Sequence, residues 1–405
     1  MKVLGIIVEY NPFHNGHLYH LKNAISLVKP DFVVAVMSGN FVQRGEPAII
    51  DKFARAEMAL RAGVDAIFEI PSIYAFQDAS GFATGAVGLL NSMNVVDDLV
   101  FGSESNDIES ISEIASVIVE EPEEFKKRLK EHLKKGLSFP NARRFAISGM
   151  LEEKSDNMRY SNNILGIEYI VALQKLRSRI KPHTIKRIGS DYNDERMSEI
   201  PSATAIRKAI FQGSGIRGLP DFSFEILRRE FEEGRGPVFP EDLFDFLRKK
   251  VLILEREGLE GIYGFNEGIA ERFFISACKS ANLKEFLESV KTKRFTFTRI
   301  KRRMIYAIFD VDRELVLRSN DHGPQYLRLL GFRHGSREVL RAISDRSSIP
   351  VISNMSGFKN ALKSKGIDVA LAQDQMKYDL KVSNFYRLYF KSQNCEDDFR
   401  KPVVI

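Results

Sequence analysis

The chain has 405 residues, of which 44% are hydrophobic and 28% are charged, and this composition is typical of a globular protein with two or three domains. Its apolar runs are all shorter than the roughly 20 residues that span a bilayer, and the run at 3–8 is too short for a signal peptide. Two cysteines, Cys278 and Cys395, are too few for a disulfide scaffold or a thiolate zinc site, so we expect a cytoplasmic protein. The net charge of +6 divides into −6 over residues 1–110 and +12 over the rest, which indicates chemistry at the front and a polyanion held mainly by the rear.

Short apolar runs alternate with amphipathic stretches over residues 1–107, which is the pattern of βαβ units. The predicted strands are 3–8, 31–39, 64–71 and 96–105, and the predicted helices are 16–28, 49–63 and 79–93. Strands that alternate with helices form a parallel, doubly wound sheet, so we predict a Rossmann-like α/β fold with ligands at the carboxyl ends of the strands. The polar segments HNGH, SGN, PS and GSES all lie at those ends.

Two histidines, His14 and His17, bracket Gly16 where the first predicted strand turns into the first predicted helix. Free backbone N–H groups and the positive end of the helix dipole make such a place an anion site. An imidazole there can donate to a phosphate, and the glycine lets phosphates approach the backbone closely. The alternative is that both histidines are ordinary surface or capping residues, but H-x-G-H at a strand–turn–helix junction favours the phosphate site.

The pattern becomes more helical and more basic towards the rear of the chain. Residues 108–150 predict charged helices, 160–176 a strong helix, 183–190 one more strand, and 202–213 a helix with Ser202 as its N-cap. Beyond about residue 216 helices dominate. We therefore predict a catalytic domain at 1–215 and a mainly helical, basic region at 216–405.

A second motif, SATAIRK at 202–208, follows the last predicted sheet strand. Its helix start offers hydroxyl and backbone donors to a β- or γ-phosphate, and Arg207 can bind the same phosphates with two N–H groups. Alone, such a string is more often a capping feature than a site. Its place about 190 residues after H-x-G-H favours a nucleoside triphosphate site.

These motifs resemble the paired H-x-G-H and I-S-S-T-x-I-R motifs of the HIGH-type nucleotidyltransferases, although Pro201 stands where isoleucine is usual and Ala203 replaces a serine. The chain as a whole, from Met1 to about residue 390, resembles the bacterial tRNA(Met) cytidine acetate ligase family. The segments that carry this resemblance are VEYNPFHNGHLYHL, VAVMSGNFVQRGEPAIIDKFARAEMAL, FEIPSIYA, VFGSES, SNNILGIEYI and PSATAIR.

The resemblance implies an ATP-dependent ligase. Such enzymes form acetyl-adenylate and pyrophosphate from acetate and ATP, and then transfer the acetyl group to N4 of the wobble cytidine of elongator tRNA(Met), giving N4-acetylcytidine. ATP is thus the expected substrate, with Mg²⁺ alongside its phosphates, and we expect neither a metal site built by the protein nor a protein partner. Positioning and electrostatic stabilisation carry most chemistry of this kind, so no protein nucleophile is needed.

The resemblance also implies which residues act. His14 and His17 are expected to stabilise charge on the α-phosphate and the departing pyrophosphate, while Thr204 and Arg207 are expected to hold the β- and γ-phosphates. Without the resemblance, Asn162 is better explained as a helix cap and Arg187 as a surface charge. The implied ATP-binding residues are Ile7, Val8, Glu9, Tyr10, Asn11, Pro12, Phe13, His14, Asn15, Gly16, His17, Gly102, Asn162, Arg187, Ile188 and Ser202.

The segment SGNFVQRGEP at 38–47 is the least generic loop in the chain. In this acetate and acceptor loop, Arg44 is placed to steer acetate or a phosphate, Asn40 to orient the acceptor base, and Gln43 to extend the polar reach. A structural turn followed by a solvated arginine is an equally good explanation.

A basic segment, KTKRFTFTRIKRR at 291–303, contains seven Lys/Arg among thirteen residues. A helix over 297–308 has an apolar face, predicted to pack inward, and a basic face, predicted to bind tRNA phosphates. The apolar face is Phe297, Ile300, Met304 and Ile308, and the basic face is Arg299, Arg302, Arg303 and Tyr306. The predicted tRNA-binding residues are Lys293, Arg294, Arg299, Arg302 and Arg303, with Arg328, Arg333, Arg337 and Arg341 as an extension of this surface. Solvated helix charges are the alternative.

Two other functions stay open on the sequence alone. A small-molecule adenylyltransferase that releases pyrophosphate has the same two motifs, but leaves the basic rear half unexplained. An RNA-binding protein whose nucleotide site only senses ATP is disfavoured by the intact H-x-G-H and Arg207 motifs.

Overall fold

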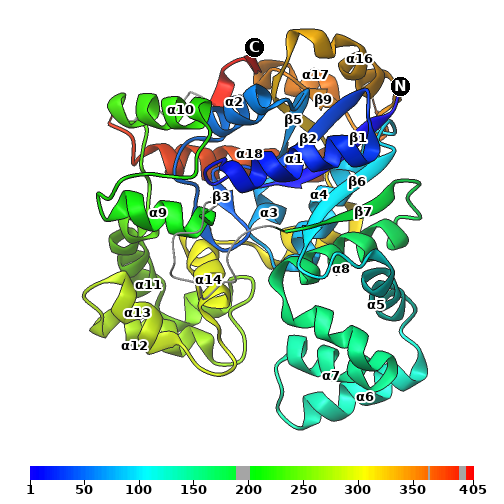
Figure 1. Ribbon diagram of the computed structural model, residues 1–405. Coiled ribbons are helices and arrows are strands. Elements are labelled where there is room, and N and C mark those ends of the chain that lie inside the picture. The colour runs from blue at the N-terminus through cyan, green and yellow to red at the C-terminus, as the bar shows by residue number, and fades with distance from the viewer. Residues whose placement is uncertain (188–200, 364, 392–397) are drawn as a thin grey trace.

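The computed structural model of the chain describes residues 1–187, 201–363, 365–391 and 398–405. Within these ranges an eight-stranded sheet runs in the order β10-β8-β5-β2-β1-β6-β7, with β9 beside β8 (Figure 1). Its strands are β1 (Val3–Val8), β2 (Phe32–Ser38), β5 (Ala66–Ile70), β6 (Asp98–Ser103), β7 (Lys181–Lys186), β8 (Leu327–Phe332), β9 (Val351–Ile352) and β10 (Val403–Val404). A separate hairpin is formed by β3 (Phe41–Val42) and β4 (Glu46–Pro47).

Successive residues of a strand point to opposite faces of the sheet, and helices cover both of these faces. Val34 and Val36 of β2 belong to the core layer that contains α4 (Ala79–Ser92), α5 (Ile108–Glu120) and α8 (Ser161–Lys175). Val33 and Ala35 of the same strand belong to the opposite layer, with α1 (Asn15–Val28) and α2 (Lys52–Ala62). This three-layer arrangement confirms the predicted doubly wound α/β fold.

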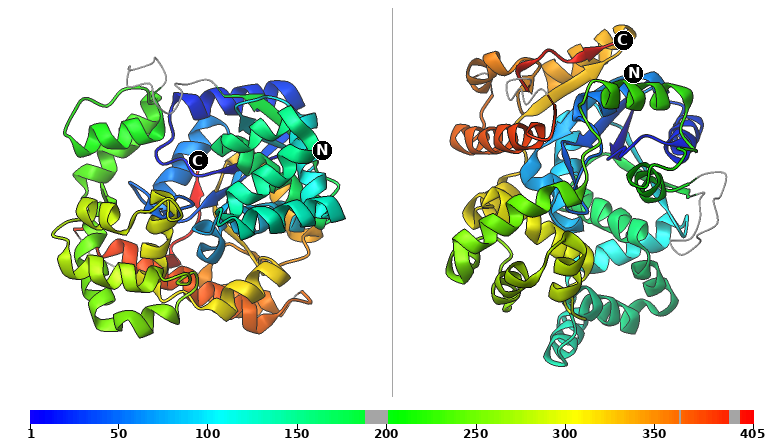
Figure 2. Two further views of the ribbon diagram at one scale, coloured as in Figure 1. Left: turned by 90° about the horizontal axis from the view of Figure 1, so that it is seen from below. Right: turned by 90° about the vertical axis from the view of Figure 1, so that its left-hand side faces the viewer.

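The rear half of the chain adds strands that the sequence analysis missed. β5, β2, β1, β6 and β7 are parallel neighbours, but β8 runs antiparallel to β5, so the sheet is mixed (Figure 2). β9 and β10 then pair in parallel with β8 and have only two residues each, too few for a periodic signal. Strands from the predicted 216–405 region therefore complete the sheet of the predicted 1–215 domain.

Two of the remaining helices form an arm. The arm consists of α6 (Glu123–Lys134) and α7 (Phe139–Leu151) and extends away from the sheet (Figure 1). Every helix in the described part of the chain is too short or too polar to cross a membrane. The other helices are α3 (Ser72–Ala75), α9 (Ala203–Phe211), α10 (Asp221–Glu232), α11 (Phe244–Glu260), α12 (Ile269–Lys279), α13 (Leu283–Val290), α14 (Phe297–Phe309), α15 (Arg313–His322), α16 (Arg337–Arg346), α17 (Phe358–Leu362) and α18 (Val369–Arg387), with 3₁₀ turns η1 (Glu152–Arg159), η2 (Pro240–Leu243), η3 (His334–Ser336) and η4 (Met355–Gly357).

The strand order places a topological switch point beside β1. The chain proceeds from β1 outward to β2 and β5 on one side, and returns to β6 and β7 on the other. Open α/β sheets bind ligands at the carboxyl ends of the strands next to such a point. The segment after β1 and the end of β6 are therefore where the fold itself predicts a site.

Candidate active site

His14 and His17 together cap the first helix. His14 is the N-cap of α1, and its Nδ1 accepts a hydrogen bond from the Gly16 N–H at 3.0 Å. Nδ1 of His17 accepts from the His14 N–H at 3.3 Å, and the two rings stack with centroids 3.7 Å apart. Because both Nδ1 atoms accept, each neutral ring carries its proton on Nε2. The capping role is therefore real, and it leaves an N–H donor on each ring.

Both rings are held in the neutral form. Burial, followed by the positive charges of Arg187 and Arg207, lowers the pKa of His14 to about 3. Burial also places the pKa of His17 well below its ordinary value of 6.5, with smaller contributions from His14, Arg187 and His20. Neutral imidazoles can donate N–H groups to a phosphate but bring no charge of their own. The positive charge of the site must come from arginine and lysine.

The segment between β1 and α1 is fixed from behind. Asn11 Oδ1 accepts from the Ile49 N–H at 2.8 Å, and Arg55 Nη1 donates to the Glu9 carbonyl at 2.6 Å. Among the described residues, the Tyr10 hydroxyl, Asn11 Nδ2 and His20 Nε2 are buried with no hydrogen-bond partner. Buried polar atoms are nearly always paired in native proteins, so these atoms fit a polar ligand such as a nucleotide.

The end of β6 meets this segment. A Cβ at Gly102 would lie 3.1 Å from Arg187 Cγ and 3.7 Å from His20 Cδ2. Arg187 Nη1 donates to Asn162 Oδ1 at 3.1 Å, and Asn162 Nδ2 donates to Glu104 Oε1 at 2.6 Å. Gly102, Asn162 and Arg187 thus lie together beside α1, whereas Ile188 lies outside the described residues. His20 and Glu104 were missed, although the spacing of three from His14 through His17 to His20 was visible in the sequence.

The second motif reaches the first through Arg207. Its Nη1 donates to the Asn11 carbonyl at 2.8 Å, across 196 residues of sequence. Ser202 caps α9, as predicted, by accepting from the Ala205 N–H at 3.2 Å. Thr204 and Arg207 line a cavity of about 440 Å³ that also borders α13 and α14. The structure therefore brings the two motifs together at the switch point.

The loop at 38–47 has a structural inner side and a polar outer side. Asn40 is buried, and its Oδ1 accepts from the Lys52 N–H at 2.9 Å, so its position is fixed by the start of α2. The Gln43 N–H donates to Glu9 Oε1 at 2.7 Å, which ties the loop to the end of β1. Arg44 lines the cavity beside Arg207. Roles for Asn40, Gln43 and Arg44 towards acetate or the acceptor base stay predictions.

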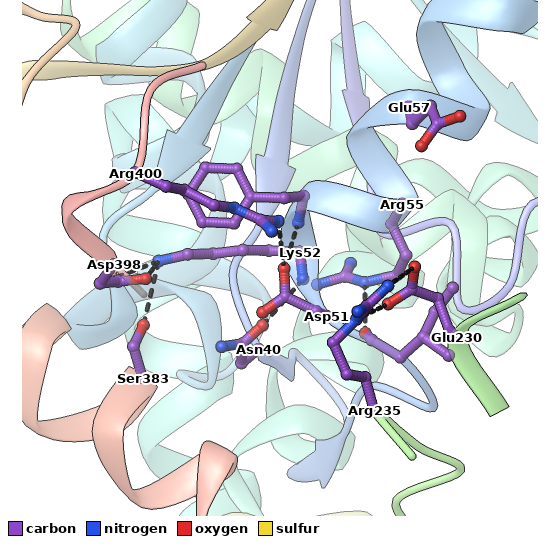
Figure 3. A network of polar contacts seen from close by, with 12 residues as sticks. Asn40, Asp51, Lys52, Arg55, Glu57, Glu230, Arg235, Ser383, Asp398 and Arg400 are labelled. Atoms are coloured by element: carbon purple, nitrogen blue, oxygen red, sulfur yellow. Dashed lines mark hydrogen bonds and ion pairs between the residues drawn. The ribbon is translucent and has the colours of Figure 1, made fainter. Parts of the chain in front are cut away.

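A buried network of ion pairs lies at the start of α2, next to this loop (Figure 3). Lys52 Nζ lies 2.8 Å from Glu69 Oε1 and 3.1 Å from Asp398 Oδ1. Asp51 accepts from Arg400 Nη2 at 3.0 Å. These contacts join the start of α2 to β5 and to the end of the chain, and sequence reasoning missed all of them.

The predicted basic helix exists, but two of its predicted positions are wrong. α14 begins after Thr296, whose side chain caps it. Phe297, assigned to the inner face, is 40% exposed and lines the cavity. Tyr306, assigned to the outer face, is buried and donates to the Phe76 carbonyl at 3.2 Å. The last two turns of α14 are buried on all sides, so a prediction that assumes one solvent-exposed face is wrong there.

The predicted tRNA-binding residues differ in the exposure and in the contacts of their side chains. Lys293 and Arg294 are exposed before α14. Arg299 lies over the Phe295 ring at 4.8 Å, Arg302 is partly buried, and Arg303 Nε donates to the Gly264 carbonyl at 3.1 Å.

The predicted extension of this basic surface is wrong. Arg328 is buried, and its Nη1 lies 2.9 Å from Asp398 Oδ2. Arg337 and Arg341 lie on α16, at the end of the molecule opposite α14 (Figures 1 and 2). Arg333 follows β8 and pairs with Asp65 at 3.8 Å. A charge count along the sequence could not separate these positions, because their separation is tertiary.

Among the described residues, no group of three His, Cys, Asp or Glu side chains is placed to hold a metal ion. Glu46, the carboxylate nearest to Arg207, is bound to two cations instead. A magnesium ion carried by ATP is held mainly by phosphates and water and needs few protein ligands.

Comparisons with known proteins agree with this geometry. The HIGH Nucleotidyl Transferase family profile matches residues 1–401. The chain is 49% identical over 421 residues to the tRNA(Met) cytidine acetate ligase of Thermosipho africanus, covering 100% of both, and 48% identical over 407 residues to that of Thermotoga maritima, covering 97% of both. It is similar, with a TM-score of 0.95, 48% identity and 100% coverage of both chains, to the crystal structure of Thermotoga maritima TmcAL bound with alpha-thio ATP. The chain belongs to the tRNA(Met) cytidine acetate ligase family of HIGH nucleotidyl transferases.

Proposed function

We propose that this protein is an ATP-dependent tRNA(Met) cytidine acetate ligase that forms acetyl-AMP and transfers its acetyl group to N4 of the wobble cytidine of elongator tRNA(Met). The observation that carries the proposal is the meeting of His14, His17 and Arg207 at the switch point of the sheet, with Arg207 Nη1 2.8 Å from the Asn11 carbonyl. Neutral N–H donors next to a fixed guanidinium suit a triphosphate that loses pyrophosphate. The relatives are named tRNA(Met) cytidine acetate ligases, and these names indicate acetate and tRNA as the substrates.

In the first step, a carboxylate oxygen of acetate attacks the α-phosphorus of ATP, and the bond to the β-phosphate oxygen breaks. Charge shifts onto the α-phosphate oxygens and the leaving pyrophosphate. The Nε2–H groups of His14 and His17 stabilise the first, and Thr204 with Arg207 stabilises the second. Because the rings are neutral before the reaction, their donors are already aligned and need no prior protonation. Mg²⁺ enters with ATP and shares the phosphate charge.

In the second step, N4 of the cytidine attacks the acetyl carbonyl carbon, the bond from that carbon to the AMP phosphate oxygen breaks, and N4 loses one proton to solvent as AMP leaves. The exposed Lys293 and Arg294 lie next to α14, which lines the same cavity as Arg207. Cations here can hold tRNA phosphates while the base enters from the cavity side. The division into a catalytic region at 1–215 and a tRNA-binding region at 216–405 is part of this proposal.

The test uses ATP, labelled acetate and elongator tRNA(Met), with acetyl-AMP and N4-acetylcytidine measured by chromatography and mass spectrometry. The wild-type protein is expected to form both products. His17→Ala should lower the rate of acetyl-AMP formation by about 10²–10³, since one aligned donor is lost. His334→Ala is the matched control and should change nothing, because this exposed histidine follows the end of β8 beside the start of β5, at the edge of the sheet opposite the start of α1. Pyrophosphate release without any need for acetate would instead identify an adenylyltransferase.

A further inference from the structure

One carboxylate links the nucleotide side of the molecule to the basic helix. Glu46 on β4 accepts from Arg207 Nη2 at 3.0 Å through Oε2 and from Lys301 Nζ at 2.5 Å through Oε1. The three side chains are only 12% to 25% exposed. Two cations that share one carboxylate lie close to each other, so Lys301 of α14 is positioned beside the arginine of the second motif.

These side chains border the cavity of about 440 Å³ described above. The nucleotide side of its wall contains Arg44 and Thr204, and the opposite side contains Lys284 and Glu288 of α13. Arg207 also donates to the Asn11 carbonyl, so one residue of the cavity wall contacts the segment between β1 and α1. Lys284 and Glu288 are exposed to solvent, whereas Arg207 and Lys301 are largely buried and share the Glu46 carboxylate.

The cavity wall carries four cations, Arg44, Arg207, Lys284 and Lys301, and three carboxylates, Glu46, Glu241 and Glu288, so its net charge is +1. Burial raises the pKa of Glu46, but Lys301 and Arg207, with a smaller effect of Arg44, lower it to a net value below its ordinary 4.5. Glu46 is therefore ionised and neutralises only one of the neighbouring cations. Its two oxygens accept charge-assisted hydrogen bonds from Arg207 and Lys301 of the kind that phosphate oxygens can also accept.

We propose that Arg207 and Lys301 form a two-cation clamp for the pyrophosphate part of ATP, and that Glu46 holds this clamp and competes with phosphate for it. The identity of the anion rests on the proposed function, because acetyl-AMP formation releases pyrophosphate. Through Lys301, the helix that carries the predicted tRNA-binding residues reaches the nucleotide. Pyrophosphate that occupies the clamp displaces Glu46, and its departure returns both cations to the carboxylate.

The test is calorimetric titration of the full-length protein with inorganic pyrophosphate, without acetate or tRNA. Lys301→Met removes one charge-assisted bond and should weaken pyrophosphate binding about tenfold or more. Glu46→Gln removes the internal competitor and should tighten binding about tenfold. Lys284→Met and Glu288→Gln make the same charge changes on the exposed α13 side of the cavity and should alter the dissociation constant by less than about threefold.

Weaker binding in Glu46→Gln, or equal losses in Lys301→Met and Lys284→Met, would overturn the clamp. Lys301→Arg keeps the charge and should bind pyrophosphate nearly as the wild type does, which separates a lost contact from a misfolded variant. A wild-type protein that binds pyrophosphate but forms no acetyl-AMP supports the clamp and contradicts the proposed function. A protein that forms acetyl-AMP but whose Lys301→Met variant binds pyrophosphate normally contradicts the clamp alone.

Discussion

His14 and His17 use their two nitrogens for different tasks. Each Nδ1 accepts a backbone N–H at the start of α1, and each Nε2 is left to donate. Capping and phosphate binding, which compete as explanations of the sequence, are thus compatible in the structure. The capping contacts also hold the rings in one orientation, so the donors are aligned before the nucleotide arrives.

The neutral state of His14 predicts how stability depends on pH. The pKa of His14 is about 3 in the folded chain and about 6.5 when unfolded, so the unfolded chain binds more protons between these values. The contribution of His14 to stability is therefore complete above pH 6.5 and falls as the pH decreases. Between pH 7 and pH 5 the loss is about 2 kcal/mol.

His14→Gln removes this titration. The variant should lose about 2 kcal/mol less stability than the wild type between pH 7 and pH 5, as measured by urea unfolding at both values. The His334→Gln variant, which changes an exposed histidine after β8, serves as a control for the assay. Equal losses in the wild type and His14→Gln would show that His14 is not held neutral by the fold.

The residues named by the paired motifs were predictable, while their acidic partners were not. H-x-G-H and Arg207 stand in recognisable motifs, whereas Gly102, Asn162 and Arg187 were expected only from the family resemblance. Glu46 and Lys301 have no such signal, because their importance comes from a contact across 255 residues of sequence. Only the folded chain shows that this carboxylate joins two regions.

At the scale of elements, the alternation of short apolar runs with amphipathic stretches predicted the main strands and helices of residues 1–107. The strands β1, β2 and β5 are apolar runs that are buried on both faces of the sheet. β9 and β10 are too short to show a period, and the end of α14 is buried all round. In both cases the neighbouring elements, and not the local sequence pattern, determine which side chains are buried.

The hairpin of β3 and β4 explains why the loop at 38–47 is so distinctive. Gly45 has a φ of 75°, which favours glycine, and a Cβ there would lie 2.6 Å from the Lys301 carbonyl carbon. The hairpin therefore packs directly on the backbone of α14. This close approach brings Glu46 within reach of Lys301.

The ion network beneath the loop should be a main source of stability for the joined elements (Figure 3). Asp398 is buried and accepts from Lys52 at 3.1 Å, Arg328 at 2.9 Å and Arg387 at 3.3 Å. Burial raises the pKa of Asp398, but these three cations lower it to a net value below its ordinary range. The carboxylate is thus charged, and its removal takes one acidic partner from each of three buried cations.

Asp398→Asn should lower the free energy of unfolding by about 3–5 kcal/mol, as measured by urea unfolding at pH 7. Asp245→Asn breaks an exposed pair with Lys249 on α11 and should change it by less than about 0.5 kcal/mol. A loss below about 1 kcal/mol in Asp398→Asn would mean that the network contributes to the arrangement of the elements but not to their stability.

For the whole molecule, the uneven charge along the chain predicts catalysis at the front and polyanion binding at the rear, and this division stays a prediction. The acidic residues 1–110 contain four of the eight strands of the described sheet, and the basic remainder contains α14. The boundary at 215 is less complete than the sequence suggests, because β8 and β10 return to the sheet. Because the rear half is packed into the sheet, a change at the nucleotide site can reach the predicted tRNA surface. The contacts of Glu46 with Arg207 and Lys301 require such a connection.

The two steps of the proposed reaction can be separated in one measurement. The wild type and the double variant Lys293→Gln with Arg294→Gln are first given ATP and labelled acetate, and elongator tRNA(Met) is added afterwards. Lys293 and Arg294 are chosen because both are exposed, whereas Arg303 donates to the Gly264 carbonyl and its removal would also disturb the fold.

We predict that both proteins form acetyl-AMP at the same rate and that the wild type then moves the label onto the tRNA. The double variant should transfer the label about tenfold more slowly, with a weaker dependence on salt, because two phosphate contacts are lost. Label that reaches the tRNA without passing through acetyl-AMP, or an equal loss of both steps in the double variant, would contradict the proposed division between the nucleotide site and the basic helix.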